Sequence, residues 1–165
     1  MTPHFRLAKL DDVYDLAPRL RLADVEEIHD AAGLTALSAL EFSFKNAIEV
    51  NSMIADDGEI IGMFGVNPTA DPLLASAWML CSDRLPEFKK EFLPQSLEWV
   101  KETNDKYPIL FNYVAKSNLK AIRWLKYLGF TFVQLIEHYG YGQKPFYEFV
   151  RINDVCRSSN INGNS

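Results

Sequence analysis

Cysteine is scarce in this sequence, and its two copies lie far apart. Cys81 and Cys156 form no Cys-x-x-Cys spacing, and no pair of histidines lies close to either of them. A disulfide framework or a zinc site needs such clusters, so we expect neither, and we expect no bound metal. Reduced thiols are typical of the cytoplasm, which is the location that we predict.

The sequence also lacks an excess of positive charge and any long apolar run. Its formal net charge is −5, whereas a nucleic-acid-binding domain usually carries a basic face. No apolar run approaches the roughly 20 residues that span a bilayer. Met1–Leu10 has no apolar signal-peptide core, and Asp11 and Asp12 follow it directly. We therefore expect neither nucleic acid nor a membrane as a partner.

What is present is typical of a folded globular protein. Hydrophobic residues make up 48% and charged residues 24% of the 165 residues, which predicts one domain, over residues 4–152. Aromatic residues reach 13% and predict a bulky core. Residues 153–165 are rich in Ser and Asn and have little to bury, so we expect a flexible polar tail.

Turn and cap residues divide the first half of the chain. A helix is expected to start at a cap formed by Asp11 or Asp12, to be divided at Pro18, and to end at Gly33. Thr35 starts another helical stretch. Strands are expected at His4–Ala8, Ser52–Ala55, Ile60–Val66, Leu73–Cys81, Ile109–Val114, Phe130–Glu137 and Pro145–Ile152.

Two more helices are expected in the second half. One covers Leu85–Thr103, with Pro94 either kinking it or marking its first turn. The other is capped by Ser117 and stopped by Gly129, which permits a left-handed turn into the next strand. The resulting order of elements predicts a mixed α/β fold, with a central twisted sheet of six to seven strands and helices on both faces.

The segment that runs from Asn118 through Ala121 to Gly129 and Phe130 resembles a known motif. It is similar to the Asn-x-x-Ala-x-x-x-(Tyr)-x-x-x-Gly-Phe pattern of the GNAT N-acetyltransferases. The hairpin around Gly58 is also similar to the second hairpin of that family. The resemblance implies a GNAT-like fold over residues 4–152 and acetyl-CoA as the cofactor.

By this resemblance, several residues are candidates for the site. Those for cofactor binding are Met79, Leu80, Cys81, Arg84, Lys89, Asn118, Ala121 and Trp124, with the backbone N–H groups of residues 79–81 orienting the cofactor. Those for substrate binding are Glu26 and Glu27.

Each of these residues also has a simpler structural explanation. Asn118 and Ala121 serve equally well as cap and packing residues of a helix. For Arg84 and Lys89, a solvated helix face is the favoured explanation. For Glu26 and Glu27, surface charge is the favoured explanation. Cys81 is either a nucleophile or a buried thiol, and a buried thiol is favoured because no histidine is adjacent in the sequence.

Three departures from the family pattern affect the chemistry. The stretch Cys81–Phe92 contains no glycine, although the family cradles a diphosphate on a glycine-rich loop there. Leu125 stands where many members have a tyrosine that protonates the departing thiolate. Leu73–Cys81 carries no Asp or Glu to act as a base. We therefore assign no catalytic residue from the sequence.

A narrower resemblance concerns the internal virion protein A group of podophages. It rests on the segments Glu27–Gly33, Trp78–Asp83, Phe111–Val114 and Asn118–Gly129. It implies a phage-encoded protein that acts in virion assembly, in the host cytoplasm or the virion, with phage virion proteins as partners and with weak or lost transferase chemistry. The alternatives are an active acetyl-CoA-dependent N-acyltransferase and a protein that binds a host protein.

Overall fold

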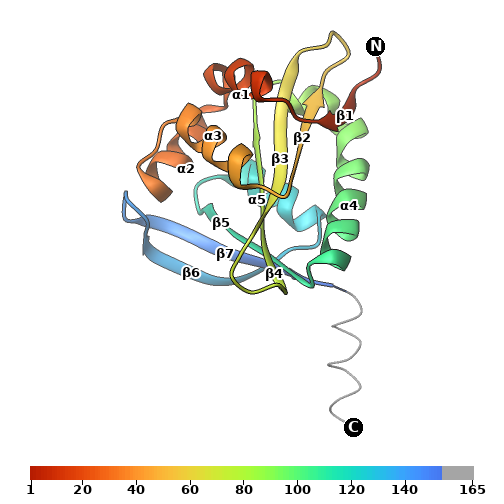
Figure 1. Ribbon diagram of the computed structural model, residues 1–165. Coiled ribbons are helices and arrows are strands. Elements are labelled where there is room, and N and C mark those ends of the chain that lie inside the picture. The colour runs from red at the N-terminus through yellow and green to blue at the C-terminus, as the bar shows by residue number, and fades with distance from the viewer. Residues whose placement is uncertain (154–165) are drawn as a thin grey trace.

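The computed structural model describes residues 1–153 and contains one seven-stranded mixed sheet (Figure 1). The order of the strands is β1-β2-β3-β4-β5-β7-β6. The strands are β1 (His4–Leu7), β2 (Glu49–Ile54), β3 (Ile60–Pro68), β4 (Leu74–Cys81), β5 (Ile109–Ala115), β6 (Thr131–Tyr139) and β7 (Lys144–Ile152). The predicted fold class and the predicted order of elements are confirmed.

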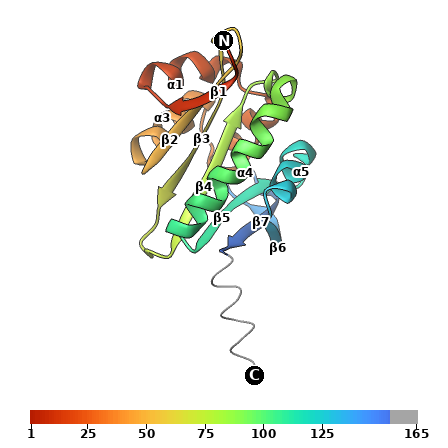
Figure 2. The same cartoon turned by 90° about the vertical axis from the view of Figure 1, so that its right-hand side faces the viewer.

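Helices cover both faces of the sheet. They are α1 (Leu10–Leu16), the 3-10 turn η1 (Ala17–Arg19), α2 (Leu22–Ala32), α3 (Ala36–Asn46), the 3-10 turn η2 (Leu85–Phe88), α4 (Lys89–Lys106) and α5 (Leu119–Tyr127). The helices α1–α3 lie on one face, and α4 and α5 lie together on the other (Figures 1 and 2). Each face buries its own apolar cluster, so the sheet lies between two hydrophobic layers.

The ends of the helices follow the sequence with two corrections. Gly33 ends α2 in a left-handed conformation, and the Thr35 side chain caps α3, as predicted. The N-cap of α1 is Lys9, and Asp12 instead accepts the Lys9 N–H from the third helical position. The N-cap of α5 is Asn118 rather than Ser117. The N-cap of α1 thus lies two or three positions before the predicted residues, and that of α5 lies one position after the predicted Ser117.

The predicted helix over Leu85–Thr103 is also corrected. It begins with the 3-10 turn η2 and continues as α4 to Lys106, and Pro94 lies inside α4 rather than at its first turn. The predicted flexible tail, apart from Asn153, lies outside the described residues. Within residues 1–153, no helix is both long and apolar enough to cross a membrane.

The strands β4 and β5 form the one parallel pair of the sheet. They are in register over only three residue pairs, from Leu74↔Ile109 to Ser76↔Phe111. Beyond these pairs β4 continues to Cys81 along β3, and β5 continues to Ala115 along β7. The two strands therefore separate toward their carboxyl ends, which leaves a gap in the middle of the sheet.

The helix α2 crosses this gap and is fastened on both sides. Near its start, the Arg21 N–H donates to the carbonyl of Cys81 at 2.9 Å. At its end, the turn between β6 and β7 packs on it, and the Gly142 N–H donates to the carbonyl of Asp30 at 2.8 Å. Gly140, with φ of 68°, approaches the backbone of Ala31 so closely that a Cβ atom would collide with it.

Candidate active site

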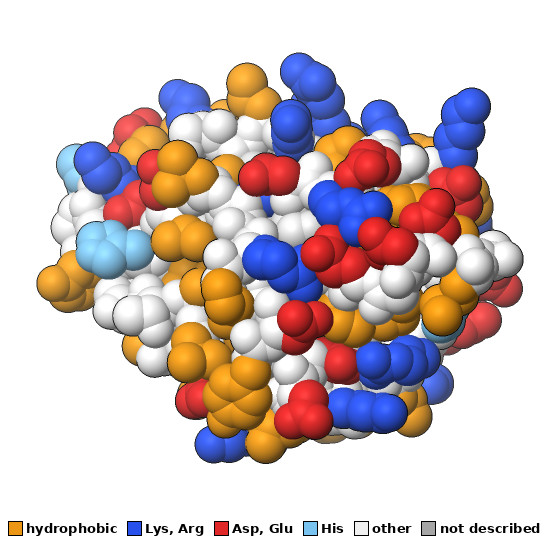
Figure 3. Space-filling model, turned by 90° about the horizontal axis from the view of Figure 1, so that it is seen from above, with side chains coloured by type: hydrophobic (Ala, Val, Ile, Leu, Met, Phe, Trp, Pro, Cys, Tyr) orange, Lys and Arg blue, Asp and Glu red, His pale blue; other side chains and the backbone are white. Residues whose placement is uncertain are grey.

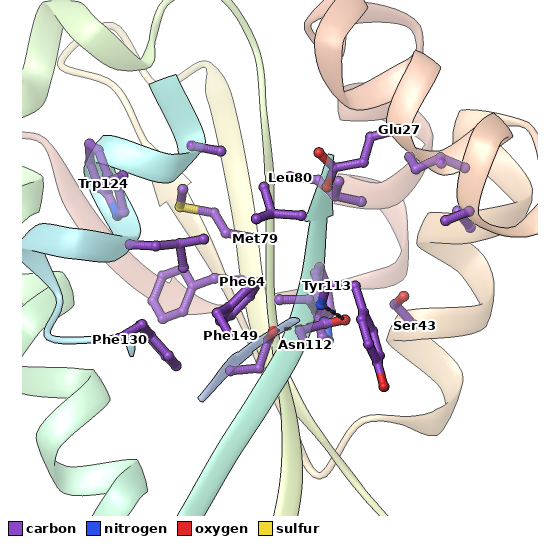
Figure 4. Close-up of a pocket in the computed structure, with 18 of the residues that line it drawn as sticks. Glu27, Ser43, Phe64, Met79, Leu80, Asn112, Tyr113, Trp124, Phe130 and Phe149 are labelled. Carbon is purple, nitrogen blue, oxygen red and sulfur yellow. Dashed lines mark hydrogen bonds between the residues drawn. The ribbon is translucent and has the colours of Figure 1, made fainter. Parts of the chain in front are cut away.

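A cavity of about 380 Å³ occupies the gap between β4 and β5. Both helical layers contribute to its wall, with α2 and α3 on one side and α4 and α5 on the other. In Figure 4, Trp124 and Phe130 lie toward one end of the cavity, and Tyr113 and Ser43 lie toward the other. Its volume is within the range of small-molecule sites, roughly 300–1,000 Å³.

The wall of this cavity is mostly aromatic and aliphatic. Among the described residues that line it, Glu27 is the one side chain with a formal charge. The other polar groups come mainly from two serines and Asn112. Such a wall, with a single carboxyl group, is typical of a site that holds a ligand by its apolar body and orients it by a few polar contacts.

Glu27 reaches from α2 to the end of β5. Its Oε2 atom accepts the N–H of Ala115 at 3.1 Å and the Nδ2–H of Asn118 at 2.8 Å. Its Oε1 atom accepts no hydrogen bond from residues 1–153. Burial raises the pKa of Glu27 to about 7, against the two hydrogen bonds, which lower it. The carboxyl group therefore titrates near neutral pH and keeps one oxygen atom available.

Asn112 and Tyr113 belong to the site, although neither is among the residues predicted for it. The Asn112 amide spans the start of the gap, donating to the carbonyl of Ala77 at 2.9 Å and to Ser76 Oγ at 3.2 Å. Tyr113 stacks on Tyr139 with ring centroids 4.7 Å apart. A polar Asn within an otherwise apolar strand was the sequence signal that could have identified this position.

The backbone of β4 presents one peptide unit to the middle of the gap. The N–H and C=O of Cys81 face α2, because Asp24 and Arg21 bond to them. Backbone groups alternate sides along a strand, so those of Leu80 face β3 and those of Met79 face the gap, beyond the last pair with β5. Of the three predicted backbone donors, Met79 is the one with access to the cavity.

Trp124 contributes its ring to the wall, while its indole N–H lies beneath the surface. Its indole N–H is buried and has no hydrogen-bond partner within the described part of the chain. Its side chain lines the cavity from α5. A buried donor without a partner is costly, and because the nitrogen atom itself is buried it does not face the cavity.

The mouth of the gap is closed by carboxylates from α2. The Asp24 carboxylate accepts the Cys81 N–H at 3.0 Å, while Glu27 accepts the Ala115 N–H on the opposite strand.

Cys81 is a buried free thiol, and burial raises its pKa. It is therefore a core residue and not a nucleophile, in agreement with the favoured prediction.

Arg84, in the connection between β4 and α4, is surrounded by carboxylates. The Arg84 guanidinium donates to Asp57, Glu59 and Glu87 at 2.9, 2.7 and 3.1 Å. The η2 turn uses backbone N–H groups internally, since those of Leu85 and Glu87 donate to Ser82 and Arg84. The view from above shows acidic and basic side chains intermixed over this face of the molecule (Figure 3).

The structure thus separates the predicted site residues into two groups. Those that line the cavity are Met79, Leu80, Ala121, Trp124 and Glu27. Those that lie outside its wall are Cys81, Arg84, Lys89, Asn118 and Glu26. Asn118 still contributes through Glu27, to which it donates. Leu125, in the position of the family tyrosine, is part of the wall, whereas Tyr127 is 47% exposed and does not line it.

A search with the sequence matches no protein-family model and no curated protein. The fold, in contrast, matches solved acetyltransferase structures over nearly its whole length. One is Ard1 from Thermoplasma volcanium, at 16% identity, covering 93% of this chain and 99% of that one with a TM-score of 0.70. This chain has the fold of the GNAT acetyltransferases.

Two further structures of the same fold carry ligands. AAC(6')-Ib in complex with ribostamycin and coenzyme A has 16% identity, with 95% of this chain and 97% of that one covered and a TM-score of 0.68. Spermidine N-acetyltransferase from Vibrio cholerae in complex with CoA and spermine has 14% identity, 92% and 96% coverage and a TM-score of 0.63. At this identity the likeness concerns the fold alone.

The residues of the site fit one part of coenzyme A and not the other. The apolar gap, with the N–H of Met79, suits a pantetheine arm, whose length is apolar apart from two amides and a hydroxyl group. The η2 turn does not suit the diphosphate, because its N–H groups are used internally and Arg84 is already paired with carboxylates. The chain therefore has the GNAT fold, but its η2 turn does not fit the diphosphate of coenzyme A.

Proposed function

We propose that this protein transfers an acyl group from a thioester to an amine bound in the cavity between β4 and β5. The observation that carries the proposal is the position of Glu27, whose unbonded Oε1 belongs to the one formally charged side chain of an apolar cavity within residues 1–153. The fold, which is shared with acetyltransferases, supports this activity.

Glu27 is suited to hold the amine and to take its proton. An amine arrives mainly as an ammonium ion. Its N–H groups can donate a hydrogen bond to the Oε1 atom. A general base works best with a pKa near the operating pH, and the pKa of Glu27 is about 7. Its bonds to the Ala115 N–H and to Asn118 hold the carboxyl group in place from β5 and α5.

The remaining groups position the reactants. The N–H of Met79 is suited to donate a hydrogen bond to an oxygen atom of the donor arm, and the mostly apolar wall disfavours water. The ammonium group first loses one proton to solvent by way of Glu27. A bond then forms between the amine nitrogen and the acyl carbon, the carbon–sulfur bond breaks, and a second proton from the nitrogen passes through Glu27 to the released thiolate.

We prefer this proposal to the hypothesis from the sequence that the transferase chemistry is weak or lost. That hypothesis rested on the glycine-free stretch Cys81–Phe92, on Leu125 and on the absence of an acid in β4. The first two features remain, whereas a carboxyl group enters the cavity from α2. The role in virion assembly, the host or phage protein partners and the host-cytoplasmic location stay predictions, because nothing in the fold or the comparisons bears on them.

The test compares two neighbouring carboxylates. Release of free thiol is measured with acetyl-CoA and a panel of amines for the wild type, Glu27→Gln and Glu26→Gln. Glu26 is exposed and lies outside the cavity wall, so it is a matched control on the same helix. We expect Glu27→Gln to slow amine-dependent release by about 10²- to 10⁴-fold and Glu26→Gln to leave it unchanged.

The proposal fails on either of two results. One is the absence of amine-dependent thiol release from the wild type, together with no heat of binding for acetyl-CoA or acetyl-pantetheine. The other is full activity of the Glu27→Gln variant, which would remove the residue on which the proposal rests.

A further inference from the structure

One half of the cavity, here called the acceptor half, is where the amine would bind. Its side chains indicate a class of substrate, which the fold alone does not. It lies between α2, α3 and the β5–β7–β6 part of the sheet, and its wall includes Trp78, Tyr113 and Tyr139. Two apolar side chains that line it, Leu34 and Phe42, are 39% and 62% exposed, so the cavity has an apolar rim.

From this wall we propose that the acceptor is a molecule with a single amine on an aromatic or aliphatic body, and not a polyamine or an aminosugar. The inference rests on the proposed function, because it names the substrate class of the same site. It follows because the described wall of the cavity has one formally charged side chain, Glu27, and is otherwise mostly apolar.

The charge available in the wall matches one ammonium group. Glu27 offers one free oxygen atom, and no other Asp or Glu within residues 1–153 lines the cavity. A second ammonium group in the same ligand would move from water into a wall that offers it no carboxylate. Transfer of an unpaired charge into such surroundings costs several kcal/mol, so a ligand with two cationic ends is disfavoured.

The remaining wall suits an apolar body. Trp78 donates its indole N–H to Asn67 at 2.6 Å and stacked Tyr113 and Tyr139 present ring surface, so these side chains are held in place before a ligand arrives. Aromatic faces also attract a cation near them, which favours an ammonium group that passes them on the way to Glu27. A sugar, by contrast, would leave several hydroxyl groups without partners in this wall.

A matched pair of amines isolates the effect of the second charge. Hexylamine and 1,6-diaminohexane share the same chain and differ in one terminal amine. We expect hexylamine to bind at least about tenfold more tightly, as measured by calorimetry, and to give the higher rate of thiol release. Phenylethylamine should behave like hexylamine, and spermidine and ribostamycin should behave like the diamine.

A second carboxylate should reverse this preference. Ser43 on α3 lines the cavity near Tyr113, so Ser43→Asp adds a carboxylate to the acceptor wall. We expect the ratio of the two affinities to shift toward the diamine by about tenfold. Ser38→Asp is the matched control, because Ser38 is exposed on the same helix and lies outside the wall, and it should leave the ratio unchanged.

The outcomes separate the two proposals. Equal or tighter binding of the diamine by the wild type overturns the inference about the acceptor, while turnover of either amine keeps the proposed function. Absence of binding and turnover for every amine overturns both. A Ser43→Asp variant with a native circular dichroism spectrum and an unchanged affinity ratio would show that this wall does not meet the far end of the acceptor, which also overturns the inference.

Discussion

Replacing the Glu27 carboxyl group by an amide should change how the stability of the protein depends on pH. The pKa of Glu27 is raised from 4.5 to about 7 in the folded state, mainly because the group is buried. Over the pH range between these two values the folded state holds a proton that the unfolded chain has released. The carboxyl group therefore contributes stability below about pH 4.5, and this contribution is lost as the pH rises through about 7.

The size of the effect follows from the size of the shift. One pKa unit corresponds to about 1.4 kcal/mol, so the whole shift corresponds to about 3 kcal/mol in the free energy of unfolding. Most of this loss falls between about pH 5 and pH 8, around the two pKa values. For a chain of this length it lowers the melting temperature by roughly 6–12 °C.

The assay is urea unfolding of the wild type, Glu27→Gln and Glu26→Gln at several pH values. Contributions from histidines and other groups that titrate in this range cancel in the difference between wild type and variant. We expect the wild type to lose about 2–3 kcal/mol relative to Glu27→Gln between about pH 5 and pH 8, and Glu26→Gln to follow the wild type. Parallel curves for wild type and Glu27→Gln would refute the reasoning, because the carboxyl group would then titrate as it does in the unfolded chain.

Three further predictions concern the core and the donor site. Asn104→Ala should lower the free energy of unfolding by about 2–4 kcal/mol in urea titrations, because the fully buried amide donates to three backbone carbonyls; unchanged stability, or an equal loss in the exposed control Gln95→Ala, would contradict this. Arg84→Ala should change the calorimetric affinity for acetyl-CoA by less than about threefold, because exposed ion pairs already occupy the guanidinium. A tenfold loss would mean that Arg84 leaves its carboxylates to bind a phosphate. Acetyl-pantetheine should bind within about tenfold of acetyl-CoA, and a much larger gap between the two would show that the nucleotide end is recognised after all.

The fold was predictable because its signals are local. Gly33 and Gly129 adopt a left-handed backbone conformation, and Thr35 accepts an N–H from the first turn of its helix. The turn at Gly58 separates two apolar runs. Each of these requirements is met by atoms a few residues away. The errors at Lys9 and Ser117 are of the same local kind and amount to one or a few positions.

The site was predictable only in part because its contacts join distant segments. Glu27 was identified as a candidate, yet its partner Ala115 lies 88 residues further along the chain, and nothing near Glu27 indicates that it enters a cavity. Arg84 has the charge that a phosphate requires, but Asp57 and Glu59 of a separate hairpin take up that charge. Sequence therefore indicated the type of group available, while the tertiary structure determines whether the group is free.

The short pairing between β4 and β5 has a mechanical consequence. Only three residue pairs join the half of the sheet that contains β1–β4 to the half that contains β5, β7 and β6. The helix α2 bonds to both halves, to Cys81 on one side and to Ala115 and Gly142 on the other. It therefore acts as a brace between two half-sheets on this face of the sheet.

In such an arrangement, a ligand too large for the existing cavity is admitted only by loosening the protein. A molecule that widens the gap must break the bonds of Asp24 or Glu27 to the strand ends, and hydrogen exchange at the Cys81 and Ala115 amides would report both. The part of the chain that binds the substrate is then also the part that keeps the two half-sheets together.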